Sequence, residues 1–471
     1  MFKYFVHVLA LTFTLMMTTS VNAQTSIHDL QGAWLGAMQI PDGPKLKIGL
    51  EIFKKADGQW GGNIASLDQN QRYIPVSSVK FKVDTLTVQM AGAPVSIQVK
   101  TEPGSKKLIG SFNEGSSAFP IELKRVKGLP EIKRPQTPSK TVPYLIKEVS
   151  YKNPLDGTWL SATVTSPKDD KKHPTVILIA GSGPAHRDEY FSGHRPFMVL
   201  ADTLTRQGFV VLRADKRGVY KSTGEYRSAT QNNFTQDTIA AIQFLRLQQQ
   251  VDVTKINLVG HSEGSLIAAM VGETEKVNSI ISMAGPGLTV LKTILLQDQT
   301  EPAAKGATKA ETDVLLGFSQ RFYQIVLNND SEEQRKQKLQ ALYDELSGNE
   351  EKIVNQWNNR SGTLNVDFAA RDSFSDMLKG DPLKHWRNIS VPVLVLNGSK
   401  DSQVPAKENV TGIMTALSHA NNNQVDKKIF LDMNHMFQKA DTGATTEYAE
   451  INESINPEVL STIGKWLKKK N

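Results

Sequence analysis

The first part of the chain alternates between apolar and polar residues. From about residue 27 to residue 125, short alternating stretches are separated by Gly, Asp and Asn, as at 47–52, 85–90 and 95–99. Alternation with a period of two, broken by turn residues about every eight to twelve positions, is typical of antiparallel strands with one face in water. The pattern therefore predicts a small all-β domain over residues 24–126, either a sandwich or a barrel.

A different pattern begins near residue 144. Continuous apolar runs occupy residues 176–180, 209–212, 256–259 and 391–396, and stretches with helical periodicity, such as 235–249, lie between them. Strands that are apolar throughout are expected to be covered on both faces, and strands that alternate with helices build a mostly parallel sheet. We therefore expect residues 144–471 to form one doubly wound α/β domain with right-handed crossovers.

Two segments fall outside these patterns. Residues 127–143 contain prolines at positions 130, 135, 138 and 143, which favours an extended, semi-rigid linker between the two domains. About a hundred residues, 288–388, separate two of the predicted strands, and apolar residues recur in them at helical spacing. Because a structureless connection of that length is uncommon in a compact domain, we predict a helical insertion that acts as a lid over the active-site edge of the sheet.

The N-terminal segment 1–23 has the features of an export signal. Lys3 supplies a positive charge, residues 5–17 are apolar, and Val-Asn-Ala at 21–23 fits a small-residue cleavage site. We expect cleavage after Ala23 and a periplasmic or secreted protein. No other segment approaches about twenty uninterrupted apolar residues, so no stable membrane insertion is expected.

Composition excludes several classes of function. The chain has no cysteine, which rules out disulfides, thiolate metal sites and a Cys nucleophile. The net charge of +7 comes from basic residues scattered among nearly as many acids, with a single run at 468–470, whereas a nucleic-acid-binding face needs a basic cluster. Because the histidines show no paired ligand spacing and no Gly-rich phosphate loop occurs, we expect no metal, no cofactor and no nucleic-acid partner.

A candidate nucleophile, Ser262, lies in the pentapeptide Gly-His-Ser-Glu-Gly at 260–264. A Gly-x-Ser-x-Gly sequence is weak evidence alone, but here a predicted buried strand leads in and an apolar helical stretch, 265–270, leads out. This strand-turn-helix setting is what a nucleophile elbow requires, because the two glycines allow the backbone to approach closely while the serine Oγ stands clear of the sheet.

A serine nucleophile needs a base and an acid that orients the base, in the chain order Ser, Asp or Glu, His. Asp401 lies in the loop after the strand at 391–396, and His435 lies in the loop after a strand-like stretch at 428–431. His435 is predicted to take the proton of Ser262, while Asp401 holds the imidazole in the right tautomer. Asp432 is a rival acid, disfavoured because it precedes His435 by only three residues.

An oxyanion hole requires backbone N–H groups directed at the developing charge. Glu263 supplies one at the start of its helix, and the loop Gly-Ser-Gly-Pro at 181–184 supplies the other, by register from Ser182, with Gly183 next. The following residues 186–188, His-Arg-Asp, either line the mouth of the site or face solvent. Residues 215–218, Asp-Lys-Arg-Gly, are interpreted as a structural, ion-paired turn under the site.

Four motifs together resemble the α/β-hydrolase superfamily and, within it, bacterial EstD-type serine carboxylesterases. They are the pentapeptide at 260–264, Gly-Ser-Gly-Pro at 181–184, Arg-Gly-Val-Tyr-Lys-Ser-Thr-Gly at 217–224 and Asn-His-Met-Phe-Gln at 434–438. The resemblance covers roughly residues 144–471 and is looser over the N-terminal β domain. It implies hydrolysis of short-chain acyl esters without a cofactor, with Ser262, Asp401 and His435 as the catalytic triad.

Three functions are compatible with these observations. The leading hypothesis is a secreted serine carboxylesterase that acts on a small-molecule ester through an acyl-enzyme on Ser262. The second is a serine peptidase of aminoacyl or dipeptidyl type, although such enzymes often carry a β-propeller, for which about a hundred N-terminal residues are too few. The third is a protein that binds cell-wall or glycan material through the β domain and carries a vestigial hydrolase. A missing triad member would favour the third, and none is missing.

Overall fold

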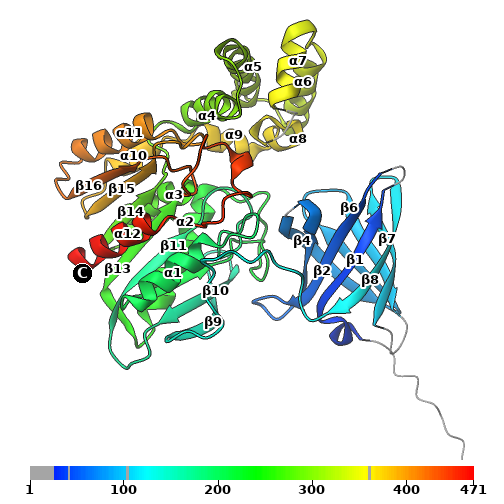
Figure 1. Cartoon of the computed structure of the whole chain (residues 1–471), viewed down its shortest axis with the longest axis horizontal. Coiled ribbons are helices and arrows are strands. Elements are labelled where there is room, and N and C mark those ends of the chain that lie inside the picture. The colour runs from blue at the N-terminus through cyan, green and yellow to red at the C-terminus, as the bar shows by residue number, and fades with distance from the viewer. Residues whose placement is uncertain (1–25, 41–42, 70, 102–105, 359–361) are drawn as a thin grey trace, which may run out of the picture.

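The computed structural model describes residues 26–471 except for 41–42, 70, 102–105 and 359–361 (Figure 1). The predicted export signal, 1–23, lies outside the described residues. Two structural units are visible, an N-terminal β-barrel and a larger α/β unit whose helices cover a central sheet. Among the described residues, no helix has the length and apolar character needed to cross a membrane.

The N-terminal unit is a closed antiparallel barrel in which the first strand pairs with both the second and the last. Side chains that alternate along these strands fill the interior, and Trp34 is among the largest of those fully buried. Its indole Nε1 donates a hydrogen bond to the Leu30 carbonyl at 2.9 Å. The predicted separate all-β domain is confirmed, and of the two predicted forms it takes the barrel. Its strands are β1 (Gly32–Gln39), β2 (Lys45–Lys54), β3 (Trp60–Ser66), β4 (Gln71–Lys82), β5 (Thr85–Met90), β6 (Val95–Thr101), β7 (Lys107–Glu114) and β8 (Ser117–Val126).

The α/β unit is built on an eight-stranded sheet with the strand order β16-β15-β14-β13-β11-β12-β10-β9. The strands from β12 to β16 along this order are parallel, whereas β10 pairs antiparallel with both β9 and β12. The predicted mostly parallel sheet is confirmed. Its strands are β9 (Leu145–Lys152), β10 (Trp159–Ser166), β11 (His173–Ile179), β12 (Val210–Ala214), β13 (Val251–His261), β14 (Ser279–Met283), β15 (Val393–Gly398) and β16 (Val425–Phe430).

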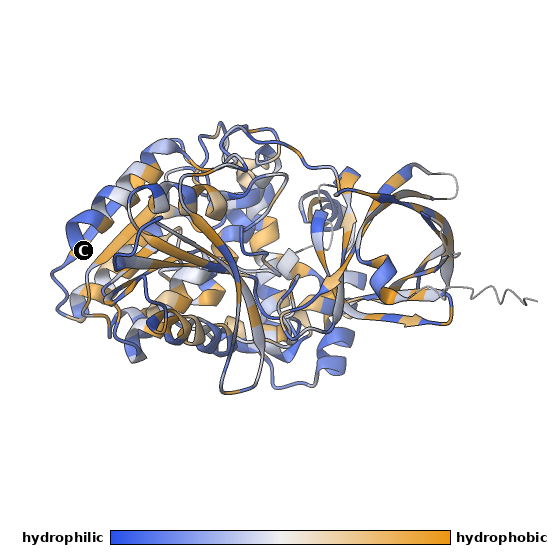
Figure 2. Ribbon diagram, turned by 90° about the horizontal axis from the view of Figure 1, so that it is seen from below, coloured by the Kyte–Doolittle hydropathy of each residue, from blue (hydrophilic) through white to orange (hydrophobic). Residues whose placement is uncertain are grey.

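Helices cover both faces of this sheet, which explains why its central strands are apolar throughout. In Figure 2 these strands are largely hydrophobic, whereas the barrel strands show hydrophobic and hydrophilic residues in turn. One core lies under α1 (Pro196–Arg206) and α12 (Pro457–Lys470). The other lies under α2 (Gln231–Arg246), α3 (Glu263–Thr274), α10 (Pro382–Trp386) and α11 (Ala406–His419).

The chain between β14 and β15 is helical and has its own hydrophobic core, separate from the two cores of the sheet. Capping fixes where these helices begin. The Thr308 side chain accepts a hydrogen bond from the Glu311 N–H and the Glu311 side chain accepts from the Thr308 N–H, a reciprocal capping box. The helices that contribute to this core are α4 (Val290–Ala304), α5 (Lys309–Leu327), α6 (Glu332–Asp344), α7 (Gly348–Trp357), α8 (Val366–Ala369) and α9 (Asp372–Leu378).

The segment between barrel and sheet, 127–143, forms no helix or strand but is packed against both units. Leu129 is buried against Ala33 and Ala65 of the barrel. Further along, the Arg134 guanidinium donates hydrogen bonds to the carbonyl oxygens of Ser192 and Ala449, both at 2.7 Å. These contacts hold the segment against the α/β unit.

Candidate active site

Ser262 lies on a sharp turn between β13 and α3, at the carboxyl edge of the parallel strands. Its backbone has φ 52° and ψ −122°, a conformation that non-glycine residues rarely adopt and that costs about 1–3 kcal/mol. The flanking glycines make the turn possible: a Cβ on Gly260 would lie 2.1 Å from the Gly264 carbonyl oxygen, and one on Gly264 would lie 2.0 Å from the Ile179 oxygen. Glu263 begins α3, so its N–H has no acceptor within the helix.

His435 and Asp401, predicted from loops far apart in the sequence, are brought together. The His435 Nδ1 and Asp401 Oδ2 atoms are 2.9 Å apart, and both side chains are buried. The other Asp401 oxygen accepts hydrogen bonds from the backbone N–H groups of Gln403 at 2.9 Å and Val404 at 2.8 Å, which fixes the carboxylate. Asp432 instead pairs with a nearby lysine at 3.1 Å. The structure therefore gives His435 the carboxylate of Asp401 and leaves Nε2 facing away from it.

The His435 loop is joined to the turn of Ser262 through His261, the residue before Ser262. The His261 Nε2 atom lies 3.0 Å from the His435 carbonyl oxygen, and the two imidazole rings are 4.8 Å apart between centroids. On its other side, the His261 Nδ1 atom lies 2.9 Å from the Glu189 carboxylate. Burial lowers the pKa of His261, but the charge and hydrogen bond of Glu189 outweigh burial, and the net pKa is raised. The charged imidazole has donors for both contacts.

The loop that follows β11 lies directly against the turn of Ser262. A Cβ on Gly181 would be 3.1 Å from the Ser262 Cβ, which is closer than an ordinary van der Waals contact, so the two segments lie very near each other. The Gly181 N–H donates a hydrogen bond to Glu189 Oε1 at 2.7 Å. Ser182 follows with an exposed side chain, and Gly183 has a φ of 91°, which favours glycine. The predicted oxyanion donors therefore lie on the two segments that meet at Ser262.

The residues after this loop are held by buried charges. His186, Arg187 and Asp188 are all buried, so the expectation that they face solvent is wrong. The Asp188 carboxylate accepts hydrogen bonds from Arg213 Nε at 2.6 Å and Arg195 Nη1 at 2.9 Å. Although burial raises the pKa of Asp188, these guanidiniums hold it well below its usual range. Paired in this way, the buried charges form a rigid base under the site.

The barrel contacts the same loop. Tyr73, from β4, stacks on the His186 imidazole with the ring centroids 4.0 Å apart and the planes 6° from parallel. Burial lowers the pKa of His186 to about 4, so the stacked ring is neutral at physiological pH. Arg195 Nη2 donates a hydrogen bond to the Tyr73 hydroxyl at 3.1 Å. The barrel is therefore packed against the segment that leads out of the predicted oxyanion loop.

Comparison with known proteins places this arrangement in a family. The model of the α/β hydrolase fold matches residues 174–441, more than half of the chain. The chain belongs to the α/β-hydrolase family. The predicted α/β-hydrolase fold is thereby confirmed. The resemblance to EstD is confirmed too: esterase EstD of Thermotoga maritima is 21% identical over 455 residues, which are 96% of this chain and 90% of that protein.

Solved structures also resemble this α/β hydrolase in part. An esterase from Pyrococcus furiosus is 17% identical, with 73% of this chain and 99% of that chain covered and a TM-score of 0.42. Est1E from Butyrivibrio proteoclasticus, solved with ferulic acid, is also 17% identical, with 68% and 96% of the two chains covered and a TM-score of 0.41.

Three side chains that surround the site of this α/β hydrolase are not indicated as site residues by the sequence. Glu189 contacts both Gly181 and His261, and no local motif distinguishes it from other loop carboxylates. Tyr73 belongs to the barrel, in which no sequence motif indicates a residue of the site. Lys216 was interpreted as part of a structural turn, yet its Nζ donates a hydrogen bond to the Gly181 carbonyl oxygen. The one signal for Lys216 in the sequence is its position directly after β12, the strand that neighbours β11.

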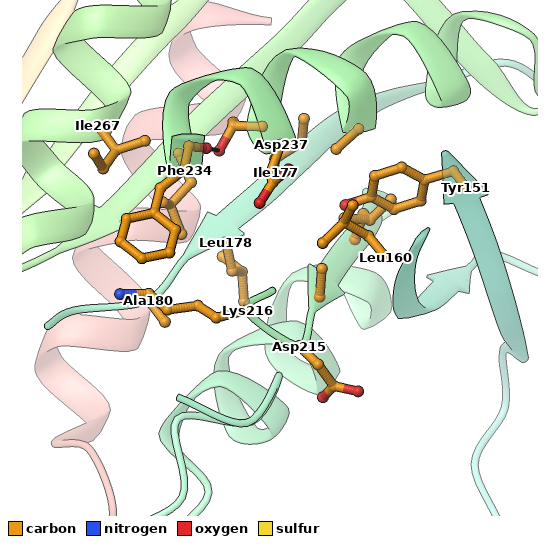
Figure 3. Close-up of a pocket in the computed structure, with 15 residues that line it drawn as sticks. Tyr151, Leu160, Ile177, Leu178, Ala180, Asp215, Lys216, Phe234, Asp237 and Ile267 are labelled. Atoms are coloured by element: carbon orange, nitrogen blue, oxygen red, sulfur yellow. Dashed lines mark hydrogen bonds between the residues drawn. The ribbon is translucent and has the colours of Figure 1, made fainter. Parts of the chain in front are cut away.

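A small cavity of about 50 Å³ lies between the sheet and α2 (Figure 3). Apolar side chains form most of its wall, and Asp215, Lys216 and Asp237 lie along it. Arg187 binds the Asp215 carboxylate and Arg217 binds the Asp237 carboxylate, both at 2.6 Å. Because both carboxylates already have these partners, the cavity has an apolar character. None of its lining residues belongs to the triad. Elsewhere, the described part of the chain has no group of three His, Asp or Glu side chains arranged to hold a metal ion.

Proposed function

We propose that this α/β hydrolase is a serine carboxylesterase that cleaves short-chain acyl esters through an acyl-enzyme on Ser262. The resemblance to esterase EstD supports ester hydrolysis. The observation that carries the proposal is the meeting of three loops at one point: the strained turn of Ser262, the His435–Asp401 pair at 2.9 Å, and the His261 link between them.

In the first half of the reaction, the Ser262 Oγ attacks the ester carbonyl carbon while His435 accepts the hydroxyl proton. Asp401, held by two backbone N–H groups, stabilises the imidazolium that results. The carbonyl oxygen becomes an oxyanion, which the N–H groups of Ser182 and Glu263 stabilise, with Gly183 as the next candidate. His435 then gives its proton to the alcohol, which leaves, and an acyl ester remains on Ser262.

In the second half, water replaces the alcohol. His435 accepts a proton from the water, whose oxygen attacks the acyl carbon through a second tetrahedral intermediate in the same oxyanion hole. Collapse of this intermediate returns the proton to Ser262 and releases the carboxylic acid. All steps use groups of the chain and water alone, so the proposal needs neither a metal nor a cofactor.

We assign the helical insertion as a cap over the carboxyl edge of the sheet. Support comes from α4, which contacts the loop of the catalytic acid: the Thr300 hydroxyl donates a hydrogen bond to the Ser402 carbonyl oxygen at 2.5 Å, and the Glu301 carboxylate accepts one from the Ser402 hydroxyl. This end of the cap is therefore a fixed wall of the site.

Export to the periplasm or medium is proposed from segment 1–23, and mass spectrometry of the mature protein is expected to find Gln24 at its N-terminus.

Hydrolysis of p-nitrophenyl esters of increasing acyl length tests the proposal. The wild type is expected to prefer short chains, and a fluorophosphonate probe is expected to label the Ser262 peptide in digests. Ser262→Ala is expected to lose labelling and at least about a thousandfold in kcat, and Asp401→Asn to lose kcat by a similar order.

Asp432→Asn is the matched control because Asp432 is a half-buried acid three residues from His435 that contacts a lysine rather than the imidazole. Its kcat is expected to stay within about two-fold of the wild type. A protein that hydrolyses no ester of the series and is unlabelled at Ser262 contradicts the proposal. Loss of activity in Asp432→Asn with activity kept in Asp401→Asn contradicts the assignment of the acid.

A further inference from the structure

Lys216 is a buried cation that the proposed mechanism does not use. It follows β12 in a turn whose neighbours fix it: its N–H donates a hydrogen bond to the Ala185 carbonyl oxygen at 3.2 Å, and the adjacent Asp215 is bound by Arg187 at 2.6 Å. The Lys216 side chain is only 9% exposed, and its Nζ lies 4.4 Å from the centre of the Phe234 ring (Figure 3). Burial of an ammonium group is costly unless its hydrogen bonds are satisfied.

The partners of this ammonium group are the two segments of the oxyanion hole. Its Nζ donates one hydrogen bond to the Gly181 carbonyl oxygen at 2.5 Å and one to Glu263 Oε2 at 3.0 Å. Gly181 immediately precedes Ser182, and Glu263 immediately follows Ser262. One side chain thus bridges the loop after β11 and the first residue of α3.

The bond to Gly181 fixes the direction of the Ser182 N–H. The Gly181 carbonyl and the Ser182 N–H belong to one planar trans peptide, in which the two groups point in opposite directions. Since Lys216 binds the carbonyl, the N–H is directed away from Lys216. The Gly181 N–H, which belongs to the preceding peptide, is held by Glu189 at 2.7 Å, so charge-assisted hydrogen bonds fix the peptides on both sides of Gly181.

We propose that Lys216 is a positioning residue of the oxyanion hole: it orients the Gly181–Ser182 peptide and ties it to Glu263, so that both N–H donors are directed at the same oxygen. This inference rests on the proposed function. The ammonium group also polarises the peptide, because a cation on the carbonyl makes the N–H of the same peptide a stronger donor. The stabilisation grows as charge develops on the ester oxygen, so it acts on the transition state more than on bound substrate.

The proposal is tested with Lys216→Met, which keeps the apolar stem and removes the ammonium group. We expect kcat to fall by about 10- to 100-fold and KM to stay within about two-fold. A trifluoromethyl ketone adds the Ser262 hydroxyl across its carbonyl, with the proton passing to His435, and leaves an oxyanion in the hole. Its Ki is expected to rise by the same factor by which kcat/KM falls.

Two further variants keep the test decisive. Lys216→Met leaves Glu263 without its buried partner, so the double variant Lys216→Met/Glu263→Gln, which removes that charge, is expected to restore folding without restoring kcat. Arg217→Met is the matched control. It breaks a neighbouring buried ion pair, Arg217 with Asp237 at 2.6 Å, and this pair makes no hydrogen bond to Gly181. It is expected to lower stability while the folded protein keeps its kcat.

The outcomes separate this inference from the function on which it rests. If the wild type hydrolyses esters and is labelled at Ser262, but both Lys216 variants keep kcat and Ki within about two-fold, Lys216 is only a structural ion pair. Equal losses of kcat in Arg217→Met overturn the inference too, because any buried pair in the turn then has the same effect. A wild type that is inactive and unlabelled overturns the proposed function, and the inference with it.

Discussion

Replacing Gly264 with alanine has two opposite effects on the unfolding free energy, a gain in helix propensity and a steric clash. Gly264 lies in the first turn of α3, and an alanine in a helix interior is worth about 1 kcal/mol more than a glycine. A Cβ at this position would, however, lie 2.0 Å from the Ile179 carbonyl oxygen and 2.7 Å from its carbon. Carbon and oxygen atoms without a bond between them normally approach to about 3.3 Å, so the end of β11 and the start of α3 must separate by roughly 1 Å.

The clash is expected to outweigh the helix propensity. Overpacking costs about 1–3 kcal/mol, and a backbone carbonyl cannot swing aside as a side chain can, which favours the upper value. Subtracting about 1 kcal/mol of helix propensity from about 3 leaves a net loss of about 2 kcal/mol in unfolding free energy. The same shift moves the oxyanion loop, which begins two residues after Ile179, away from Ser262. Displacement by about 1 Å is expected to lower kcat by about a hundredfold.

Urea denaturation followed by circular dichroism measures the first quantity, and p-nitrophenyl acetate hydrolysis at a temperature where all variants are folded measures the second. Gly317→Ala is the matched control, since a Cβ at this position in α5 would meet nothing within 4 Å. It is expected to gain about 1 kcal/mol without a change in kcat. A Gly264→Ala variant with the same gain and an unchanged kcat would refute the steric reasoning.

Three further predictions concern stability. Ala241→Val partly fills the cavity of about 50 Å³, whose complete filling is worth about 1.2 kcal/mol of unfolding free energy, and loses about 0.5 kcal/mol of helix propensity. The variant is expected to raise the urea midpoint of unfolding. A lower midpoint means that the added methyl groups find no free space. Burial raises the pKa of Asp298 from 3.8 to about 6. The unfolding free energy of the wild type is therefore expected to fall by roughly 2 kcal/mol relative to that of Asp298→Asn as pH rises from 4 to 7, and parallel pH profiles contradict this. Folding raises the pKa of His261. The stability lost in His261→Gln is therefore expected to be largest below about pH 6.5 and to shrink as pH rises through the pKa of His261 in the folded protein. A loss of stability that grows with pH excludes the Glu189 pair as its source.

The residues that sequence alone could indicate are those whose chemistry depends on local order. Ser262 is recognisable because its glycines, its strand and its helix are neighbours in the chain. Asp401 and His435 follow because the carboxyl ends of parallel strands meet at one edge of the sheet. Lys216, Glu189 and Tyr73 act through contacts made only when the loop after β11 folds back under the site. Such contacts depend on tertiary geometry, which periodicity does not encode.

The stack of Tyr73 on His186 links two units that sequence patterns treat as separate. A substitution in either ring alters the surface on which the other rests, so the two residues are expected to change together rather than singly. In a hydrolase domain without the barrel, the loop after β11 would lack the surface against which it packs in this protein. The two units are therefore expected to have been inherited together, and homologues that lose the barrel are expected to have rebuilt this loop.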